Sequence, residues 1–322
     1  MWPEIFTVFG IPPLSFGFFV AVGFLVGVQL AGRLTRKYGS DPEKDAERIP
    51  DLSWTILIGV MLGARIAYVL INLDYFSANP LSILKIWEGG LVMYGGLILA
   101  LILGLRKTRK LAMHPMQTAD YVLTSAFLGQ GIARFGCLAV GDDYGRTVQL
   151  YADGSSPWWS VTFPDPLRPG SAFPIQLTEV PLHPTQLYMS LKAFLLFALG
   201  MWLLKRKKFH GQVACILMAG YAILRAVVEF FRGDAEARGG IFKDGLSPTD
   251  VNSKLHDLGV TNSNGRIIDL DAYRQLLREG AEGVQAELLI STSQLVALVT
   301  FTIAIFMYRR LKSQAPDQLP AT

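Results

Sequence analysis

Charged residues are scarce in this chain: Asp, Glu, Lys and Arg make up 17% of its 322 residues, against about 25% in an average soluble protein. A water-soluble domain with so few charges could not cover its own surface, so the composition argues against a soluble globular protein. Cysteine is rarer still, with two residues, which excludes a disulfide-stapled scaffold. The net charge of +4 is too small to indicate nucleic-acid binding, and no nucleic-acid partner is expected.

Hydrophobic residues are abundant instead and reach 51% of the chain. They gather in seven stretches, each close to the roughly 20 residues that cross the hydrocarbon core of a bilayer. The sequence therefore predicts an all-α polytopic membrane protein with seven transmembrane helices. The predicted spans cover residues 12–32, 52–72, 89–105, 116–139, 184–204, 212–232 and 289–308.

The connections between these spans alternate in basic charge. The connections after spans one, three, five and seven are strongly basic. These connections are residues 33–50, 106–110, 205–208 and 309–312, respectively. Because basic loops stay on the cytoplasmic side, this pattern predicts an N-terminus outside the membrane and a cytoplasmic C-terminus.

Two long connections fall on the outer side in this topology. Residues 140–183 are interpreted as a wandering loop, and the polar insertion 233–288 as a small solvated cap. The two cysteines lie at opposite faces, since Cys137 ends span four outside and Cys215 begins span six inside. No intramolecular disulfide is therefore expected.

Four basic residues lie in the interior of the predicted spans, away from the span ends: Arg65, Arg134, Lys192 and Arg225. An ionised side chain in the bilayer costs at least a few kcal/mol, so each of them is a candidate functional residue. Lys192 lies two turns into span five, and snorkelling toward water explains it. The three arginines are deeper.

Span six carries Tyr221, Arg225 and Glu229 at steps of four, so their side chains share one helix face. Glu229 could be only the counter-ion of Arg225. That interpretation leaves Arg65 and Arg134 without partners, and phosphate is the alternative, because guanidinium groups bind phosphate oxygens through paired donors.

The predicted topology brings residues from six spans or span ends to one depth, in the outer half of the membrane. They are Phe16, Arg65, Tyr94, Arg134, His183, Arg225 and Glu229. A cationic pocket below the outer headgroups suits an anionic phospholipid of that leaflet. We interpret it as a site for a lipid phosphate.

Several motifs resemble a known family in order and in predicted topology. They are GARIAYVLINLDYFSANPLSILKIWEGGLVMYGG, GQGIARFGCLAVGDDYGR, PWWSVTFP, HPTQLY, YAILRAVVEFFR and ISTSQ. Together they cover nearly the whole chain and are similar to the prolipoprotein diacylglyceryl transferases. Several long motifs in one order are a much stronger signal than a single short pattern.

The resemblance implies a multi-pass transferase of the bacterial inner membrane that works in lipoprotein biosynthesis. It implies transfer of the diacylglyceryl group of phosphatidylglycerol to the lipobox cysteine of a prolipoprotein signal peptide. The products are a thioether and glycerol phosphate. The resemblance implies no metal and no cofactor, and it places 140–183 and 233–288 in the periplasm.

The resemblance also implies roles for particular residues. It assigns the essential arginines to Arg134 and Arg225, and the lipid-contacting tyrosine and its acidic neighbour to Tyr221 and Glu229. Further substrate-binding positions fall on Arg65, Asp142 and Gly145.

The chain departs from the family pattern at four positions. Tyr94 replaces a histidine, Cys137 an asparagine, Asp142 a glutamate and Phe16 a tyrosine. Among the matched motifs, HPTQLY supplies a histidine that could activate the acceptor thiol, His183. His183 is a candidate base, or it only holds the outer loop through hydrogen bonds.

Three other functions are weighed against the transferase. The first is a lipid-binding or transport protein on the same scaffold, catalytically altered at Tyr94. The second is an anion channel or transporter. Against it, this sequence shows no pair of spans interrupted by Gly or Pro, which is the usual mark of a transporter binding site. The third uses Cys137 as a covalent nucleophile, where a small buried thiol is the simpler interpretation.

Overall fold

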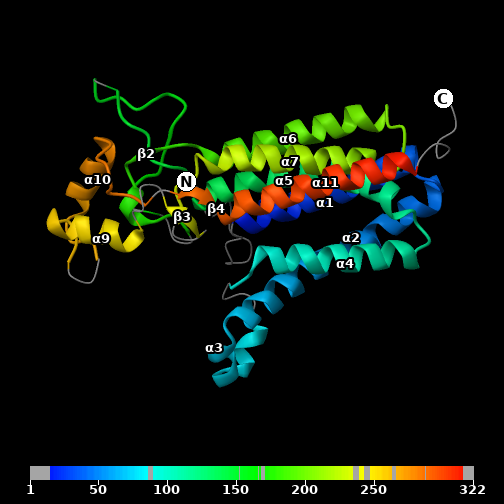
Figure 1. Ribbon diagram of the computed structural model, residues 1–322, viewed down its shortest axis with the longest axis horizontal. Helices are drawn as coiled ribbons and strands as arrows, with labels where there is room; N and C mark the ends of the chain where they lie inside the picture. The colour runs from blue at the N-terminus through cyan, green and yellow to red at the C-terminus, as the bar shows by residue number, and fades with distance from the viewer. Residues whose placement is uncertain are drawn as a thin grey trace, which may run out of the picture.

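The structure is a computed structural model and describes residues 15–85, 90–151, 153–165, 167, 171–234, 239–242, 247–262, 266–286 and 288–314. Its long helices run roughly along the long axis of the molecule (Figure 1). They are α1 (Ser15–Tyr38), α2 (Pro42–Ile71), α4 (Met93–Lys110), α5 (Pro115–Val140), α6 (Thr185–Leu204), α7 (Gln212–Glu229) and α11 (Thr292–Ser313).

Six of these helices are long and apolar enough to cross a membrane, namely all except α4. The last turns of α4 are rich in Lys and Arg, so its apolar part is short. The chain is thus a mostly helical, multi-pass membrane protein. Residues 12–14 of the first predicted span and Gly89 of the third lie outside the described residues.

Local sequence signals set several helix ends. Helix α2 begins ten residues before the predicted span, because Asp41 caps it through the amide of Lys44 and Pro42 occupies its first turn. Hydropathy detects only the apolar part of such a helix. At its C-terminal end α5 stops at Gly141, whose φ of 81° is the left-handed conformation that glycine adopts readily.

Glycines let two helix pairs approach closely. Gly23 of α1 lies against the backbone of Gly129 of α5, and Gly63 of α2 lies against Gly95 of α4, with no room for a Cβ at these positions. Small residues at crossings are the usual means of packing helices in a membrane, where hydrophobic burial gives little drive.

Short elements complete the fold at the end of the bundle that carries both long connections (Figure 1). Strand β1 (Val161–Thr162) pairs antiparallel with β2 (Pro181–Leu182), and β3 (Gly240–Phe242) with β4 (Leu288–Ser291).

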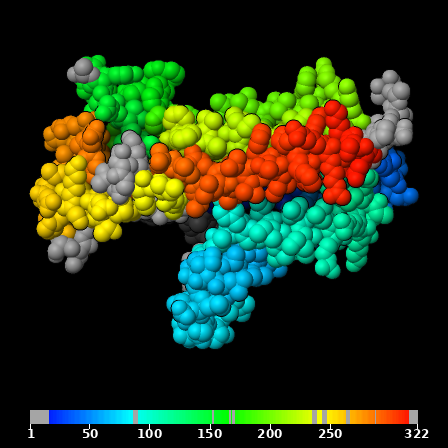
Figure 2. Space-filling model, in the orientation of Figure 1, coloured from blue at the N-terminus to red at the C-terminus, as the bar shows by residue number. Residues whose placement is uncertain are grey.

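The other elements are α3 (Leu73–Ala78), the 3-10 helices η1 (Pro80–Leu84) and η3 (Ile175–Leu177), α9 (Pro248–Asp257) and α10 (Leu270–Arg278). The segment of α3 and η1 forms a lobe that projects from the helices (Figure 2).

The two long connections, interpreted from the sequence as a wandering loop and a small solvated cap, share one hydrophobic core. In it Phe163, Phe173 and Leu177 of the first pack with Leu255 and Leu277 of the second. Each segment supplies part of this core, so hydropathy read along the chain cannot reveal it.

A buried arginine of the cap also bonds to the loop. The guanidinium of Arg274 on α10 forms an ion pair with Asp165 at 2.6 Å, and it donates to the carbonyl of Ile175 at 3.1 Å and to the hydroxyl of Thr178. The loop and the cap therefore form one unit. The four short strands are a small addition to the predicted all-α class.

Candidate active site

Arg134 lies near the C-terminal end of α5 and forms an ion pair with Asp143, just beyond that helix. Gly141 reverses the chain, and Asp143 itself has a positive φ of 55°. This tight turn brings the Asp143 carboxylate back toward the helix. Arg134 Nη1 also lies 3.6 Å from the sulfur of Cys137, one turn further along α5.

Asp143 is shared by two arginines. Its second partner is Arg232, which follows α7 and also bonds to Asp234, with Nε 2.9 Å from Oδ1. A backbone bridge between Gly145 and Arg232 joins the same two segments. The ends of α5 and α7, about 90 residues apart in sequence, are thus tied together by charge and by backbone.

Arg225 has a carboxylate partner of its own. It forms an ion pair with buried Glu229, one turn later on α7, and donates to the Ser293 hydroxyl of α11 at 3.1 Å. Glu229 is therefore the counter-ion of Arg225. The expectation that Arg134 lacks a partner is wrong, because the turn after α5 supplies Asp143, which hydropathy and helical spacing do not reveal.

Arg65 on α2 serves the projecting lobe and, among the described residues, contacts neither Arg134 nor Arg225. Its guanidinium lies near the rings of Tyr68 and Phe76 and donates to four backbone carbonyls. The expectation that Arg65 has no partner is therefore wrong as well. The acceptors are Ser82, Ile83, Lys85 and Gly90, at 2.5, 3.0, 3.2 and 3.2 Å.

Tyr221 precedes Arg225 by one turn on α7, and its ring contacts the side chain of Lys192. The ammonium nitrogen of Lys192, on α6, lies 4.3 Å from the centre of this ring. Phe127 of α5 packs on the same ring, with centroids 5.8 Å apart. Lys192 is only 4% exposed, so it does not snorkel to water as predicted.

His183 lies among aromatic rings, just before α6. Its ring is 5.0 Å from that of Trp159 and 5.1 Å from that of Phe231, and its Nδ1 is 3.3 Å from the Tyr188 hydroxyl. Its carbonyl fills the space where Gly145 would carry a Cβ. Only glycine at 145 therefore allows the two segments to approach so closely.

Two of the remaining predicted residues, Phe16 and Tyr94, differ in how close they lie to the ion-paired arginines. The backbone of Phe16 on α1 lies beside Gly136 of α5, near Cys137. Tyr94, in the first turn of α4, is half-buried and makes no hydrogen bond within the described residues. The structure thus brings Arg134, Arg225 and their neighbours together, and it leaves Tyr94 without a described contact to them.

The two adjacent aspartates differ in their electrostatics. Burial alone would raise the pKa of Asp143, but the guanidinium groups of Arg232 and Arg134 outweigh it and hold that pKa below its usual range. Burial raises the pKa of Asp142, and the neighbouring Asp143 carboxylate raises it further. Burial and nearby Arg146 lower the pKa of His183, so its imidazole is neutral near pH 7.

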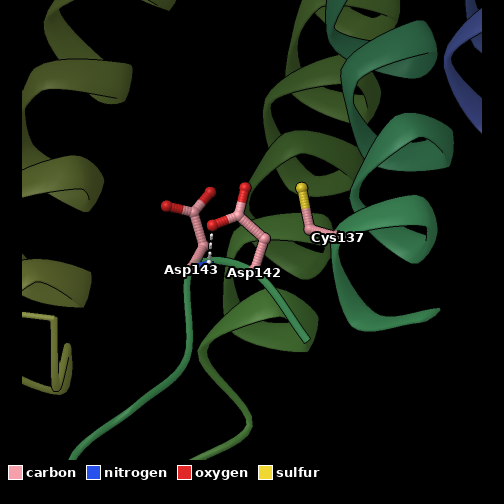
Figure 3. A group of neighbouring side chains, drawn as sticks. All are labelled: Cys137, Asp142 and Asp143. Carbon is pink, nitrogen blue, oxygen red and sulfur yellow. Dashed lines mark hydrogen bonds between the residues drawn. The ribbon is translucent and has the colours of Figure 1, made fainter. Parts of the chain in front are cut away.

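Cys137, in the last turn of α5, gathers with Asp142 and Asp143, which follow the helix (Figure 3), and one possible ligand atom of each lies within 4.8 Å of the others. The Arg134 guanidinium contacts two of the three, the thiol and the Asp143 carboxylate. A metal ion there would meet that positive charge, so the donor set fits an arginine better than a metal.

Comparison with known proteins identifies the family. The family model described as prolipoprotein diacylglyceryl transferase matches residues 3–310. The chain belongs to this family. A phosphatidylglycerol–prolipoprotein diacylglyceryl transferase of Vibrio vulnificus is 33% identical over 264 residues, covering 80% of this chain and 90% of the relative. One from Proteus mirabilis is 33% identical over 258 residues, covering 75% and 85%.

Sequence reasoning does not identify three residues of the site in this member of the diacylglyceryl transferase family: Asp143, Arg232 and Lys192. Asp143 and Arg232 were not singled out, because they follow helix ends and look like ordinary interfacial charges. Lys192 was explained by snorkelling. Its place well inside the apolar stretch 184–204 was the available signal.

Proposed function

We propose that the chain transfers the diacylglyceryl group of phosphatidylglycerol to the lipobox cysteine of prolipoproteins. The observation that carries this proposal is the family match over residues 3–310. Arg134 and Arg225, each paired with a carboxylate near the joined ends of α5 and α7, support it. The names of the Vibrio and Proteus relatives support the donor and the acceptor.

Arg134 and Arg225 bind the donor phosphate in this proposal. Each guanidinium is held by one carboxylate, Asp143 or Glu229, and has further N–H donors for phosphate oxygens. Tyr221 packs below Arg225 at the apolar side of the headgroup. The other proposed donor-site residues are Phe16, Cys137, Asp142, Gly145 and Arg65. Arg65 is proposed to contribute indirectly, by holding the projecting lobe through its bonds to backbone carbonyls.

The chemistry is a displacement at carbon. The acceptor sulfur attacks the glyceryl carbon that carries the phosphate ester, the C–S bond forms, and the C–O bond breaks with its electron pair leaving on glycerol phosphate. Negative charge grows on the leaving phosphate oxygens, and two fixed guanidinium groups stabilise that charge without reorganising. The thiol proton must pass to a base, because the thiolate is the reactive form.

His183 is the proposed base, and Tyr94 the proposed headgroup ligand. A neutral imidazole accepts a proton readily, and burial and Arg146 keep His183 in that form. A phenol has an ordinary pKa of about 10 and is a poor base at neutral pH. Tyr94 can still donate a hydrogen bond to a phosphate or ester oxygen.

The proposed topology has seven spans, with α4 as the third, in the bacterial inner membrane. The N-terminus is outside and the C-terminus is cytoplasmic. The four basic connections support this orientation. The outer unit of loop and cap, which gathers both long connections at one end of the bundle, is then periplasmic.

The test uses membranes that contain the chain, phosphatidylglycerol labelled in its acyl chains, and a lipobox peptide. We expect label on the peptide cysteine and none on the Cys→Ser peptide. Arg134→Lys and Arg225→Lys should each lower kcat by about 100-fold or more, since a point charge loses the paired donors. Arg309→Lys, at an exposed position of α11, is the matched control. Absence of label with the wild-type chain overturns the proposed function, and normal transfer by both lysine variants overturns the arginine assignment.

A further inference from the structure

Lys192, on α6, lies close to the arginine cluster, which consists of Arg134, Arg225 and Arg232. Helix α6 is fixed to α5 at this level by the Ser190 hydroxyl, which donates to the Gly131 carbonyl at 2.8 Å. The lysine is 4% exposed, and its ammonium nitrogen faces the Tyr221 ring at 4.3 Å. Tyr221 precedes Arg225 by one turn of α7. The lysine ammonium group therefore lies at the level of the turn before Arg225.

Each arginine of the cluster has a carboxylate partner, whereas this lysine has none among the described residues. Arg134, Arg225 and Arg232 are matched by three carboxylates, which are Asp143, Glu229 and Asp234. Within the described part of the chain, Lys192 forms no hydrogen bond and no ion pair. Its strongest electrostatic neighbours are Arg225, Arg134 and Arg232, all of the same sign, and then Glu229.

An ammonium group in this position lacks an anion. Burial removes most of its hydration, and three guanidinium groups repel it. The Tyr221 ring offsets only part of that cost, because a cation–π contact is weaker than an ion pair with a buried anion. An anionic ligand that enters the cluster would therefore gain from Lys192 more than from either paired arginine.

We propose that Lys192 is a third cationic ligand of the phosphate ester that binds between Arg134 and Arg225, and that this ester is the phosphodiester of the donor lipid. This inference rests on the proposed function and adds a binding residue to the same site. Helical spacing alone does not suggest Lys192, because it lies on α6, whereas the arginines lie on α5 and α7.

The test compares Lys192→Met, which keeps the length of the side chain and removes the charge, with Lys205→Met at the exposed cytoplasmic end of α6. Thermal unfolding of the purified chain is measured in detergent, alone and with phosphatidylglycerol. We expect the lipid to raise the Tm of the wild type and of Lys205→Met, and to raise that of Lys192→Met far less. Without lipid, Lys192→Met should be at least as stable as the wild type, because it removes an uncompensated buried charge.

Steady-state kinetics give the second measurement. Lys192→Met should raise the KM for phosphatidylglycerol by 10-fold or more and leave the KM for the lipobox peptide unchanged. An equal lipid-induced rise in Tm in wild type and Lys192→Met overturns the proposal, as does a lower Tm of Lys192→Met without lipid, which would make the lysine structural. An unchanged KM with weakened inhibition by free glycerol phosphate also overturns it, since the lysine would then bind only the product.

The two proposals fail in different ways. A wild-type chain that is stabilised by phosphatidylglycerol but transfers no label would remove the proposed reaction and leave the lysine assignment open to the Tm comparison. Normal transfer of label together with a Lys192→Met variant that behaves as wild type would remove the lysine assignment alone.

Discussion

Asp142 and Asp143 are neighbours in sequence, yet neutralising them should change stability in opposite directions. Asp143 binds two guanidinium groups, and its pKa lies below its usual range. Asp142 has a raised pKa, because burial and the Asp143 charge both disfavour its ionised form. We therefore expect Asp143→Asn to destabilise the chain at pH 7, and Asp142→Asn to leave it unchanged or slightly more stable.

The magnitude follows from the contacts of Asp143. Breaking a buried ion pair by removing one partner costs about 3–5 kcal/mol. The Asp143 side chain is 20% exposed and Arg232 keeps Asp234, so we expect the lower part of that range, about 3 kcal/mol. This corresponds to a fall in Tm of about 4–8 °C.

The pH dependence gives the sharper test. A lowered pKa means that Asp143 contributes stability above its ordinary value of about 3.9 and loses it as the pH falls further. The raised pKa of Asp142 means that its ionisation costs stability as the pH rises above about 4. Asp143→Asn should therefore lose much of the acid-induced fall in stability, and Asp142→Asn should retain it.

The assay is thermal unfolding in detergent between pH 3 and pH 8, with Asp257→Asn at an exposed position of α9 as the matched control. The electrostatic reasoning is wrong if Asp142→Asn and Asp143→Asn lower the Tm at pH 7 by the same amount. It is also wrong if Asp143→Asn leaves the Tm unchanged.

Four further outcomes are expected. Gly145→Ala should lower stability by about 1–3 kcal/mol, because the new methyl group meets the carbonyl of His183, whereas Gly32→Ala in α1 has open space and should unfold at or above the wild-type Tm. The pH–rate profile of His183→Gln should lose its acid limb, which in the wild type lies below the ordinary histidine pKa of about 6.5; an unchanged profile would remove His183 as the base. Tyr94→Phe should slow transfer by about 2–12-fold, the worth of one neutral hydrogen bond, and complete loss of activity would make Tyr94 the catalytic group. Leu277→Ala should destabilise the outer unit by about 2–4 kcal/mol in denaturant titration, because Leu277 lies in the core shared by loop and cap; no effect would show that the cap folds separately.

The local properties of the chain could be predicted from the sequence. Runs of apolar residues and the positions of Lys and Arg depend only on neighbouring residues, so the membrane-embedded helices follow from them directly. The same holds for the one-turn pair of Arg225 and Glu229, because a helix brings residues four apart together. The motifs around Arg134 and Arg225 were sufficient to indicate the family.

Only the tertiary structure decided which distant groups meet. Arg134 is paired because the left-handed Gly141 turns Asp143 back onto α5, and no periodic pattern encodes that turn. Lys192 reaches the cluster because α6 packs against both α5 and α7. The loop and the cap share a core because their apolar residues pack together. Contacts of this kind depend on the packing of whole elements in three dimensions, whereas hydropathy and helical spacing report one segment at a time.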